Sequence, residues 1–452
     1  MAAYVAPKNG FRTFVIVWLS QSVSVIGTML TVFAINIWLA QVLYPLPEQR
    51  TQLAWAFAAL NLAHFLPTIV FTPLAGAWAD RHDRKRTMMV CDVLSGLLSV
   101  VMTILLWTNT LELWSLLTGA VLYGILGAFH GSAFDTAYAM LVTDEQLPRA
   151  NGMMQTMWAL SQIIAPGLAT FLIAIPALVG RAGVGGPLGS ILASMTNGTP
   201  LAIGVDAVTF MLAGAVLAFL HIPSPRRTEG VQKSIWSDIG FGAKYVWQRK
   251  PLLWLLATFA MVNFTAQLGI LQPLMVKFNL AADWQARGST YELALAAINT
   301  AASVGAVASG ALVSMWGGLK RRRVLGVVIP CLGAGLVQIA FGFTTGMWVA
   351  VALAVASGLF YPVANIHSQA IWQSRVPREF QGRVFAVRRV IAQFTTPIGM
   401  TITGWLAGWL DAGVTMAILG ALAAVFCLAQ LFNPYLLKVE DVDPAMAEAV
   451  AD

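Results

Sequence analysis

Three aspartates lie inside long apolar stretches of this sequence, where a charged residue is costly. They are Asp92, Asp135 and Asp206, out of twenty acidic residues in the chain. An ionised carboxylate at the centre of a bilayer costs on the order of 2.5–3.5 kcal/mol even on insertion scales. Each of the three must therefore be paired, protonated or in contact with water, and each is a candidate group for relaying protons or charge.

Asp135 has two competing interpretations. It continues a stripe of small residues at helical spacing, so it is expected to face other helices rather than lipid: Gly124, Gly127, Ala128 and Gly131. It is then either a structural partner of Arg81 or Arg84, or a group that titrates during function. Asp92 is interpreted first as a partner of the basic segment before it. Asp206 is interpreted first as structural, with proton relay as the alternative.

Histidine is the other residue type that can carry protons near neutral pH. His64, His130 and His367 fall inside apolar stretches, and His130 lies at the mid-depth of its stretch. No two histidines have the His-x-x-x-His or His-Glu-x-x-His spacing of a metal site, so we predict no metal. The sequence contains no Gly-Lys dipeptide and hence no phosphate-binding loop. We therefore expect no cofactor, and we add His130 to the proton-relay candidates.

The segment "GAWADRHDRKR" (76–86) concentrates charge between two apolar stretches. Gly76 would let two helices approach closely. Asp80 would lie where a carboxylate can meet the positive end of a neighbouring helix. Arg81 and Arg84 follow directly and can pair with nearby carboxylates. This pattern predicts a contact between helices at one membrane surface.

The elements that position these residues follow from composition. The 452-residue chain is 58% hydrophobic and 10% charged, with a mean hydropathy of +0.73, whereas soluble domains contain about 25% charged residues. About 20 apolar residues are needed to cross a bilayer as a helix. The sequence predicts an all-α polytopic membrane protein with twelve such spans: 13–40, 52–76, 87–108, 113–141, 151–176, 200–222, 252–276, 291–315, 324–344, 346–373, 384–410 and 413–433.

The distribution of cations predicts the orientation. With the N-terminus inside, most of the 27 Lys and Arg residues fall on one side of the predicted membrane. The positive-inside rule therefore places both termini in the cytoplasm of a bacterial-type inner membrane. The net charge of +7 is explained by this asymmetry, and it gives no reason to invoke nucleic acid.

A repeat with an offset of 234 residues divides the chain. Gly76 and Asp80 align with Gly310 and Ser314, and a second region aligns at the same offset, including Gly124 with Gly358. A shared register predicts two parallel six-helix halves, which is a transporter architecture. The expected domains are two halves (1–222 and 252–433), a cytoplasmic linker (223–251) and a short acidic tail (434–452). The linker is expected to contain an amphipathic helix, with these residues on one side: Trp236, Ile239, Ala243 and Val246.

With these features, the sequence resembles the major facilitator superfamily of transporters. Gly76-x-x-x-Asp80-Arg81 is similar to the motif after that family's second helix, although Asp83 stands where the family usually has glycine. Other stretches resemble its branch of macrolide-efflux and enterobactin-exporter-like proteins: "FRTFVIVWLSQSVSVIGTMLTVFAINIWL" (11–39), "DEQLPRANG" (144–152), "DAVTF" (206–210) and "VPREFQGRVFAVRR" (376–389).

The resemblance implies alternating access to a central site, with a latch between the two halves on the cytoplasmic side. The latch residues would come from the end of the second helix and the entrance of the eleventh: Gly76, Asp80, Arg81, Arg84, Arg383, Arg388 and Arg389. Substrate pockets are mostly apolar with a few placed polar groups. The candidates for lining the cavity are Gln21, Ser24, Phe33, Trp158, Asn263, Gln267, Phe360, Tyr361, Asn365 and His367.

We therefore predict a secondary active transporter rather than an enzyme. Specifically, we expect a proton-driven exporter of an amphipathic small molecule, such as a drug, a macrolide-like natural product or a siderophore. Its partners would be that substrate, protons and the lipid bilayer, and it is expected to be a monomer. Two alternatives stay open: a transporter of lysophospholipid or another lipid with the same fold, and a transport-inactive membrane sensor or scaffold.

Overall fold

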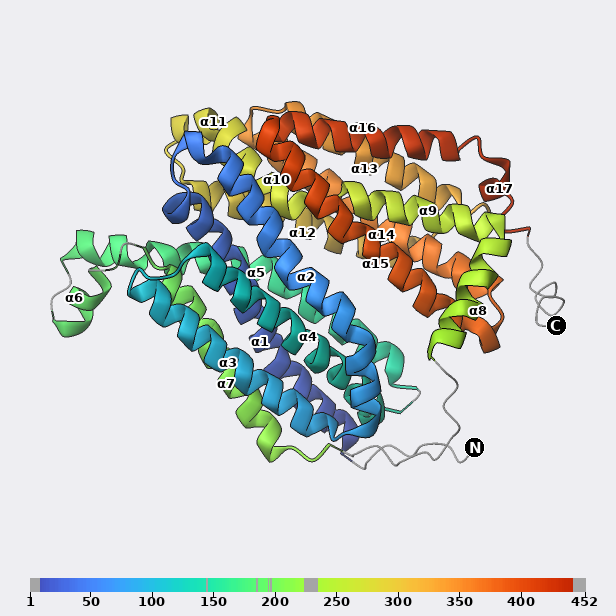
Figure 1. Cartoon of the computed structure of the whole chain (residues 1–452), viewed down its shortest axis with the longest axis horizontal. Coiled ribbons are helices and arrows are strands. Elements are labelled where there is room, and N and C mark those ends of the chain that lie inside the picture. Colours follow the sequence, from blue (N-terminus) through green and yellow to red (C-terminus); the bar gives the residue numbers. More distant parts are fainter. Residues whose placement is uncertain are drawn as a thin grey trace. The chain divides into compact units, whose positions relative to one another are not determined.

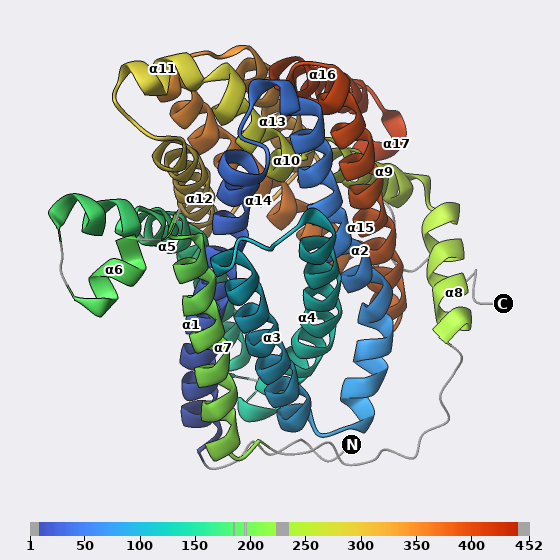
Figure 2. The ribbon, with the colours of Figure 1, turned by 60° about the vertical axis from the view of Figure 1, so that its left-hand side comes forward.

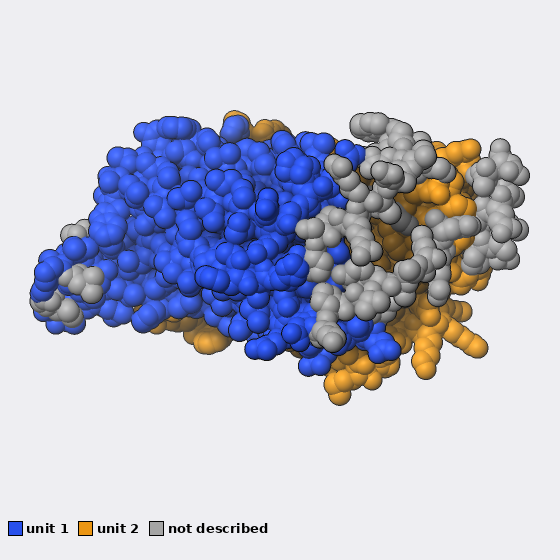
Figure 3. Space-filling view, turned by 90° about the horizontal axis from the view of Figure 1, so that it is seen from below, with its two compact units in different colours: residues 1–228 blue, residues 229–452 orange. Residues whose placement is uncertain are grey.

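The computed structural model describes residues 9–143, 145–183, 186–193, 195, 197–222 and 235–441. These residues form helices joined by turns, and none of them lies in a strand. The chain divides into two compact units, Met1–Thr228 and Glu229–Asp452, which we call unit 1 and unit 2 (Figure 1, Figure 3).

Six long helices make up most of unit 1, and each coincides with one of the first six predicted spans. α1, α3, α4 and α7 lie side by side (Figure 2). The elements of unit 1 are α1 Gly10–Trp38, η1 Leu39–Leu43, η2 Pro47–Gln49, α2 Arg50–Arg81, α3 Arg84–Trp107, α4 Leu113–Leu141, α5 Leu147–Ala182, α6 Pro187–Ala193 and α7 Thr199–Phe219.

The charged segment 76–86 forms a tight helix-to-helix turn. Asp83, which departs from the family motif, is the N-cap of α3, and its side chain accepts a hydrogen bond of 2.8 Å from the backbone N–H of Arg86. Asp at this position satisfies one of the first free N–H groups of a helix. Lys85 extends from the same turn to the carbonyl of Ala218, at 2.9 Å, where a cation suits the end of α7.

Unit 2 contains six further long helical segments that lie at the positions of the last six predicted spans. The first of them consists of α9, α10 and η3, and three shorter helices, α8, α11 and α17, accompany the six segments. The elements are α8 Ile235–Gln248, α9 Lys250–Thr265, α10 Leu268–Leu274, η3 Met275–Asn279, α11 Ala281–Ala286, α12 Tyr291–Trp316, α13 Leu325–Phe343, α14 Met347–Arg375, α15 Arg378–Trp409, α16 Ala412–Gln430 and α17 Pro434–Leu437.

The seventh predicted span is not one continuous helix, because it breaks between α9 and α10. The side-chain amide of Gln267 donates to the carbonyls of Asn263 at 2.7 Å and Phe264 at 3.2 Å. Gln338 of α13 donates to the carbonyl of Thr265 at 3.0 Å. Side-chain amides thus donate to backbone carbonyls that would accept backbone N–H groups if the helix continued. Local hydropathy does not indicate such a break.

Eleven helical segments of the described chain are long and apolar enough to cross a membrane. They include every predicted span except the eleventh, which corresponds to α15 (Arg378–Trp409). That helix carries Arg383, Arg388 and Arg389 in its first half, which lowers its apolar character. The protein is therefore an all-α multi-pass membrane protein, and a membrane span at α15, which would bring the number to twelve, remains a prediction.

Close helix contacts in the two units occur at glycines related by the 234-residue offset. A Cβ on Gly124 would meet the His64 carbonyl of α2, and a Cβ on Gly358 would meet the Ala302 carbonyl of α12. Both helix pairs thus approach closely because the glycine lacks a side chain. Equivalent packing in the two units is what an internal repeat predicts.

A helix, α8, lies where the linker was predicted to contain an amphipathic helix, and its placement on the membrane surface stays a prediction. Gly242, Tyr245 and Val246 are buried, whereas Ala243 is exposed. A Cβ on Gly242 would lie 2.7 Å from the carbonyl oxygen of Arg383, so α8 packs tightly on α15. The side chains of Trp236 and Ile239, the linker residues 223–234, Asp144 and the tail residues 442–452 lie outside the described part of the chain.

Candidate functional site

Asp92 forms the centre of a polar cluster inside unit 1. It lies on α3 and is 1% exposed. Gln21 of α1 donates its side-chain amide to Asp92 Oδ2 at 3.2 Å, and His130 Nε2 of α4 lies 3.1 Å from Asp92 Oδ1. The His130 side chain is 21% exposed. The cluster thus joins a buried carboxylate to a histidine that reaches the surface of the unit.

This geometry changes the expected role of Asp92. The sequence predicted a pairing with the basic segment, yet the contacts of Asp92 are Gln21 and His130. Gln21 donates an N–H to one carboxyl oxygen, whereas His130 Nε2 lies 3.1 Å from the other oxygen without the geometry of a hydrogen bond. Carboxylate and imidazole at this distance are candidates for proton exchange.

Asp206 lies in a second cluster, on α7, and it is fully buried. Its Oδ2 accepts hydrogen bonds from the Thr31 hydroxyl of α1 at 2.8 Å and from the Ser99 hydroxyl of α3 at 3.3 Å. Ser99 is in turn 2.5 Å from the Tyr123 hydroxyl of α4. The other oxygen, Oδ1, lies against Gly27, where a Cβ would come within 2.8 Å of it. Asp206 is therefore surrounded by hydroxyls, unlike Asp92.

Asp135 is not packed between helices as the small-residue stripe predicted. Its side chain is exposed on α4, and a Cβ on Gly127 or Gly131 would meet no atom within 4 Å. Only the part of the stripe around Gly124 packs closely, against α2. The close packing predicted from the stripe is therefore present at Gly124, and the role of Asp135 stays a prediction.

Arg84 connects the end of α2 to α4. It is 9% exposed and donates to the carbonyls of Ala79 at 3.2 Å and Thr136 at 3.5 Å, and it contacts the sulfur of Met140. The guanidinium therefore donates hydrogen bonds to backbone carbonyls of two helices. The sequence did not predict that Arg84 is buried, because it belongs to a strongly charged segment.

The other latch candidates lie in the last two turns of α2 and in the first half of α15. Asp80 is exposed near the end of α2, and a Cβ on Gly76 would meet no atom within 4 Å. Arg383 stacks 4.7 Å from the Phe241 ring centroid, and Arg389 is exposed. Arg81 belongs to the last turn of α2. The latch stays a prediction, because it requires a contact between the two units.

Arg388 is held within unit 2 by residues of α14. It donates to Gln369 Oε1 at 2.7 Å and to the Ser368 hydroxyl at 3.5 Å, and it lies 5.2 Å from the Trp372 ring centroid. Gln369 corresponds to Asp135 at the 234-residue offset. The same place in the repeat thus carries a carboxylate in unit 1 and an arginine-bound amide in unit 2.

His367 is a structural residue in this conformation. It is 2% exposed, and its Nε2 accepts the backbone N–H of Leu319 at 2.8 Å. Its Nδ1 lies 2.8 Å from the carbonyl of Val363. Since Nε2 accepts, Nδ1 must donate, so the neutral tautomer fastens the loop after α12 to α14. The sequence had placed His367 in the substrate cavity.

The remaining cavity candidates are dispersed. Gln21 and Ser24 are buried in unit 1, where Phe33 is also buried and Trp158 is exposed. In unit 2, Asn263 donates to the Ala392 carbonyl at 2.9 Å and Gln267 lies at the break of the seventh span. Phe360 packs against Gly333, and Tyr361 is exposed. Asn365, about one turn further along α14, is half-buried.

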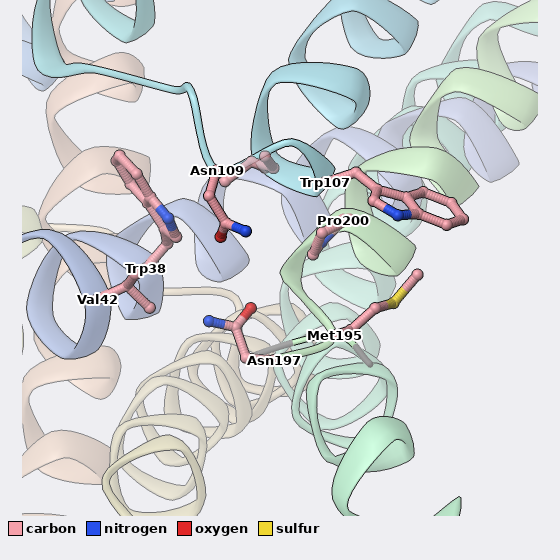
Figure 4. Close-up of a pocket in the computed structure, with 8 residues that line it drawn as sticks. Trp38, Val42, Trp107, Asn109, Met195, Asn197 and Pro200 are labelled. Atoms are coloured by element: carbon pink, nitrogen blue, oxygen red, sulfur yellow. The ribbon is translucent and has the colours of Figure 1, made fainter. Parts of the chain in front are cut away.

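A pocket of about 120 Å³ opens at the end of unit 1 opposite the charged segment 81–86. Figure 4 shows Asn109 and Asn197 with their amides near one another, and Trp38 on the α1 side. The pocket is lined by Trp38, Val42, Leu106, Trp107, Asn109, Met195, Asn197 and Pro200. It was missed in the sequence because its polar groups come from two loops rather than from a helical stripe.

The hydroxyls around Asp206 were also missed, although they left a trace in the sequence. Gln21, Ser24, Thr28 and Thr31 recur on α1 at helical spacing, and Ser95 and Ser99 follow Asp92 on α3. Serine and threonine often bond to their own helix, as Thr28 does to the Ser24 carbonyl at 3.2 Å. A hydroxyl stripe alone therefore did not indicate which of its members would contact a carboxyl.

Comparisons with known proteins add three findings. The family model described as Major Facilitator Superfamily matches residues 17–387 and 268–447. Macrolide efflux protein A of Streptococcus pyogenes is 24% identical over 438 residues, 96% of this chain and 98% of that protein. Multidrug efflux pump Tap of Mycolicibacterium fortuitum is 26% identical over 392 residues, 85% of this chain and 88% of that one.

Among solved structures, this chain is similar in fold to a bacterial homolog of the human lysosomal transporter Spinster in an inward-facing and occupied conformation. The TM-score is 0.64 at 16% sequence identity, and the match covers 98% of this chain and 96% of that one.

Proposed function

The chain belongs to the major facilitator superfamily, and on that premise we propose that it is a proton-coupled exporter of an amphipathic small molecule. The efflux relatives confirm the branch that the sequence motifs indicated, and they identify a transporter rather than an enzyme. The substrate class and the outward direction are proposed from the printed functions of these relatives, which are macrolide and multidrug efflux.

The observation that carries proton coupling is the buried pair of Asp92 and His130. A carboxylate and an imidazole in contact can bind or release one proton as the exposure of the histidine changes. His130 is partly exposed whereas Asp92 is not, so a proton would enter through the imidazole. We propose this pair as the coupling group, in preference to the exposed Asp135.

The transport cycle is proposed to be alternating access by two six-helix halves, with twelve spans and both termini in the cytoplasm. Asp80, Arg81 and Arg84 would latch against the entrance of α15, where Arg383, Arg388 and Arg389 lie. The latch would close in one state of the cycle and open in the other. Its members are supported here by their position near the end of α2, at the start of α3 and in the first half of α15.

The test uses everted membrane vesicles that respiration acidifies, loaded with a pH-sensitive dye. A macrolide, a lipophilic cation and a catecholate siderophore are added one at a time to vesicles containing intact protein, Asp92→Asn, His130→Gln or Asp135→Asn. We expect one compound to release protons with intact protein and with Asp135→Asn, and the release to be lost in the other two variants.

Other outcomes of this assay are equally informative. Loss of proton release in Asp135→Asn alone would transfer the coupling role to that carboxylate. Proton release by none of the compounds, with the protein present in the membrane at normal amounts, would contradict proton-coupled drug export. Lysophospholipid added to the same vesicles then tests the lipid alternative.

A further inference from the structure

Asp206 has an environment that differs in kind from that of Asp92. Its Oδ2 receives two hydroxyl donors, Thr31 and Ser99. Its Oδ1 is buried without a hydrogen-bond partner among the described residues. No Lys, Arg or His of the described chain forms an ion pair with it within 4.0 Å. Among the described residues, the carboxyl therefore has uncharged hydrogen-bond donors at one oxygen and no hydrogen-bond partner at the other.

Burial without a countercharge favours one protonation state. A buried ionised carboxylate that lacks a cation bears the full penalty of losing its hydration. A neutral carboxyl at the same place leaves only one polar group incompletely satisfied, which is a smaller penalty. Burial without a countercharge therefore favours the neutral acid at Asp206 over the carboxylate.

The charged and titratable groups around Asp206 do not alter this balance. On α3, Asp92 and Cys91 lie about two turns, or about 10 Å, toward the charged end, and Tyr123 of α4 reaches it only through Ser99. The cations of the helices that pack with α7 lie at helix ends: Arg12 on α1, Arg84, Lys85 and Arg86 on α3, and Arg149 and Arg181 on α5.

A buried polar stripe connects the two carboxyls. On α1 it runs from Gln21, which bonds Asp92, through Ser24 and Thr28 to Thr31, which bonds Asp206. On α3 it runs from Asp92 through Ser95 to Ser99. The α3 side chains, Gln21 and Ser24 are buried, and Thr28 and Thr31 are partly buried. The same helix α7 passes both groups, because Gly214 lies against Asp92, where a Cβ would be 3.5 Å from the Asp92 Cβ.

The pocket of Figure 4 lies beyond Asp206 on the same helices. Trp38 follows Thr31 by seven residues on α1, Leu106 follows Ser99 by seven on α3, and Pro200 precedes Asp206 on α7. A separation of seven residues is two helical turns on one face, or about 10 Å. The pocket therefore lies about two helical turns from the contacts of Asp206, at the end of unit 1 away from the charged segment.

We propose that Asp206 is a second proton-binding site, placed between the pocket and the Asp92–His130 pair on one proton path inside unit 1. A proton on Asp206 passes to a neighbouring hydroxyl, each hydroxyl gives its own proton onward, and Asp92 or His130 gains one. One proton moves and no electron is exchanged. This inference rests on the proposed proton coupling, but Asp206 can be tested without any transported substrate.

The experiment is an infrared titration of the purified full chain in lipid nanodiscs. The band of buried protonated carboxylic acids is followed from acidic to alkaline pH. We expect a band that persists to neutral pH in the intact protein, that disappears in Asp206→Asn, and that remains, shifted, in Asp206→Glu. Ser99→Ala removes one hydroxyl donor to the carboxyl and is expected to shift this band.

Ser161→Ala is the matched control, because Ser161 is also fully buried but bonds only to the Met157 carbonyl of its own helix. It should leave the band unchanged. A band that is absent from the intact protein, or that survives unaltered in Asp206→Asn, would overturn the proposal. Loss of the band when sodium replaces choline at constant pH would also overturn it, in favour of a sodium site. Because no substrate is added, failure here is distinguishable from failure of the transport assay.

Discussion

Gly124 and Gly127 lie three residues apart on α4, and the structure predicts opposite effects for the same substitution. A Cβ on Gly124 would collide with the His64 carbonyl and lie 3.1 Å from the Thr68 hydroxyl, whereas a Cβ on Gly127 would meet no atom within 4 Å. Overpacking against a backbone costs typically about 1–3 kcal/mol. Alanine is favoured over glycine in a helix interior by roughly 1 kcal/mol, and only Gly127→Ala receives that gain without a collision.

The net expectation for Gly124→Ala is a loss of up to about 2 kcal/mol, after the propensity gain is subtracted from the overpacking cost. For a unit of this size, 1 kcal/mol corresponds to a Tm shift of roughly 2–4 °C. The Tm of Gly124→Ala should therefore fall by up to about 8 °C, while that of Gly127→Ala rises by about 2–4 °C.

The assay is thermal unfolding of the purified proteins in one detergent, followed by intrinsic tryptophan fluorescence and by loss of the monodisperse elution peak. The two variants differ by position alone, so detergent and purification effects cancel in their comparison. Equal Tm values for the two variants, or a lower Tm for Gly127→Ala, would refute the argument that α4 packs on α2 through Gly124.

Three further predictions follow from hydrogen bonds outside the proposed site. The side-chain hydrogen bond from Arg287 holds the pKa of Asp283 below its ordinary value of 3.8. The stabilising contribution of this pair is therefore full above pH 3.8 and is lost as the pH falls through the lowered pKa. Asp283→Asn should flatten the acid side of a Tm–pH profile. His367→Leu should cost about 1–3 kcal/mol, because the buried N–H of Leu319 loses its acceptor, and amide exchange at Leu319 should quicken. Asp83→Ala should lower the free energy of unfolding by about 1 kcal/mol through loss of the α3 cap, measured by the fall in Tm.

Each of these three predictions has a contradicting result. An unchanged acid limb in Asp283→Asn would show that the pair with Arg287 does not contribute to folding. Unchanged exchange at Leu319 in His367→Leu would mean that water replaces the imidazole without penalty. For Asp83, the comparison is Asp83→Asn, which can still cap the helix, and equal losses in both variants would contradict capping.

The sequence predicted the long elements well because membrane crossing imposes a length and an apolar composition on each of them. It failed where side chains compete with the backbone, as at the break beside Gln267, since one amide among apolar residues gives no signal in a hydropathy window. It also failed where a residue's role depends on which neighbour it meets. His367 and His130 look alike in the sequence, yet one fastens a loop and the other contacts a buried carboxylate.

From the sequence, Asp92 and Asp206 were interpreted first as structural and Asp135 as either paired or titrating, and their environments separate the three differently. One receives an N–H donor, one is exposed, and one is enclosed by hydroxyls. The partners come from helices far apart in the chain, so no local pattern could have ranked the three carboxyls. What the sequence did supply was the short set of groups worth comparing, since a buried carboxyl in a membrane span requires a physical explanation.

The two units differ in the charge that their spans contain, and this difference supports a division of roles. The described spans of unit 1 hold Asp92, Asp135 and Asp206, whereas the acidic residues in the long helices of unit 2 are Glu292 and Glu379, both in the first turn of a helix. At the place equivalent to Asp135, unit 2 has Gln369 bound to Arg388. Protons bind to carboxylates and histidine far more readily than to an amide or a guanidinium. Under the proposed function, protons would bind mainly in unit 1, and unit 2, with its broken seventh span, would supply the neutral polar groups that a substrate needs.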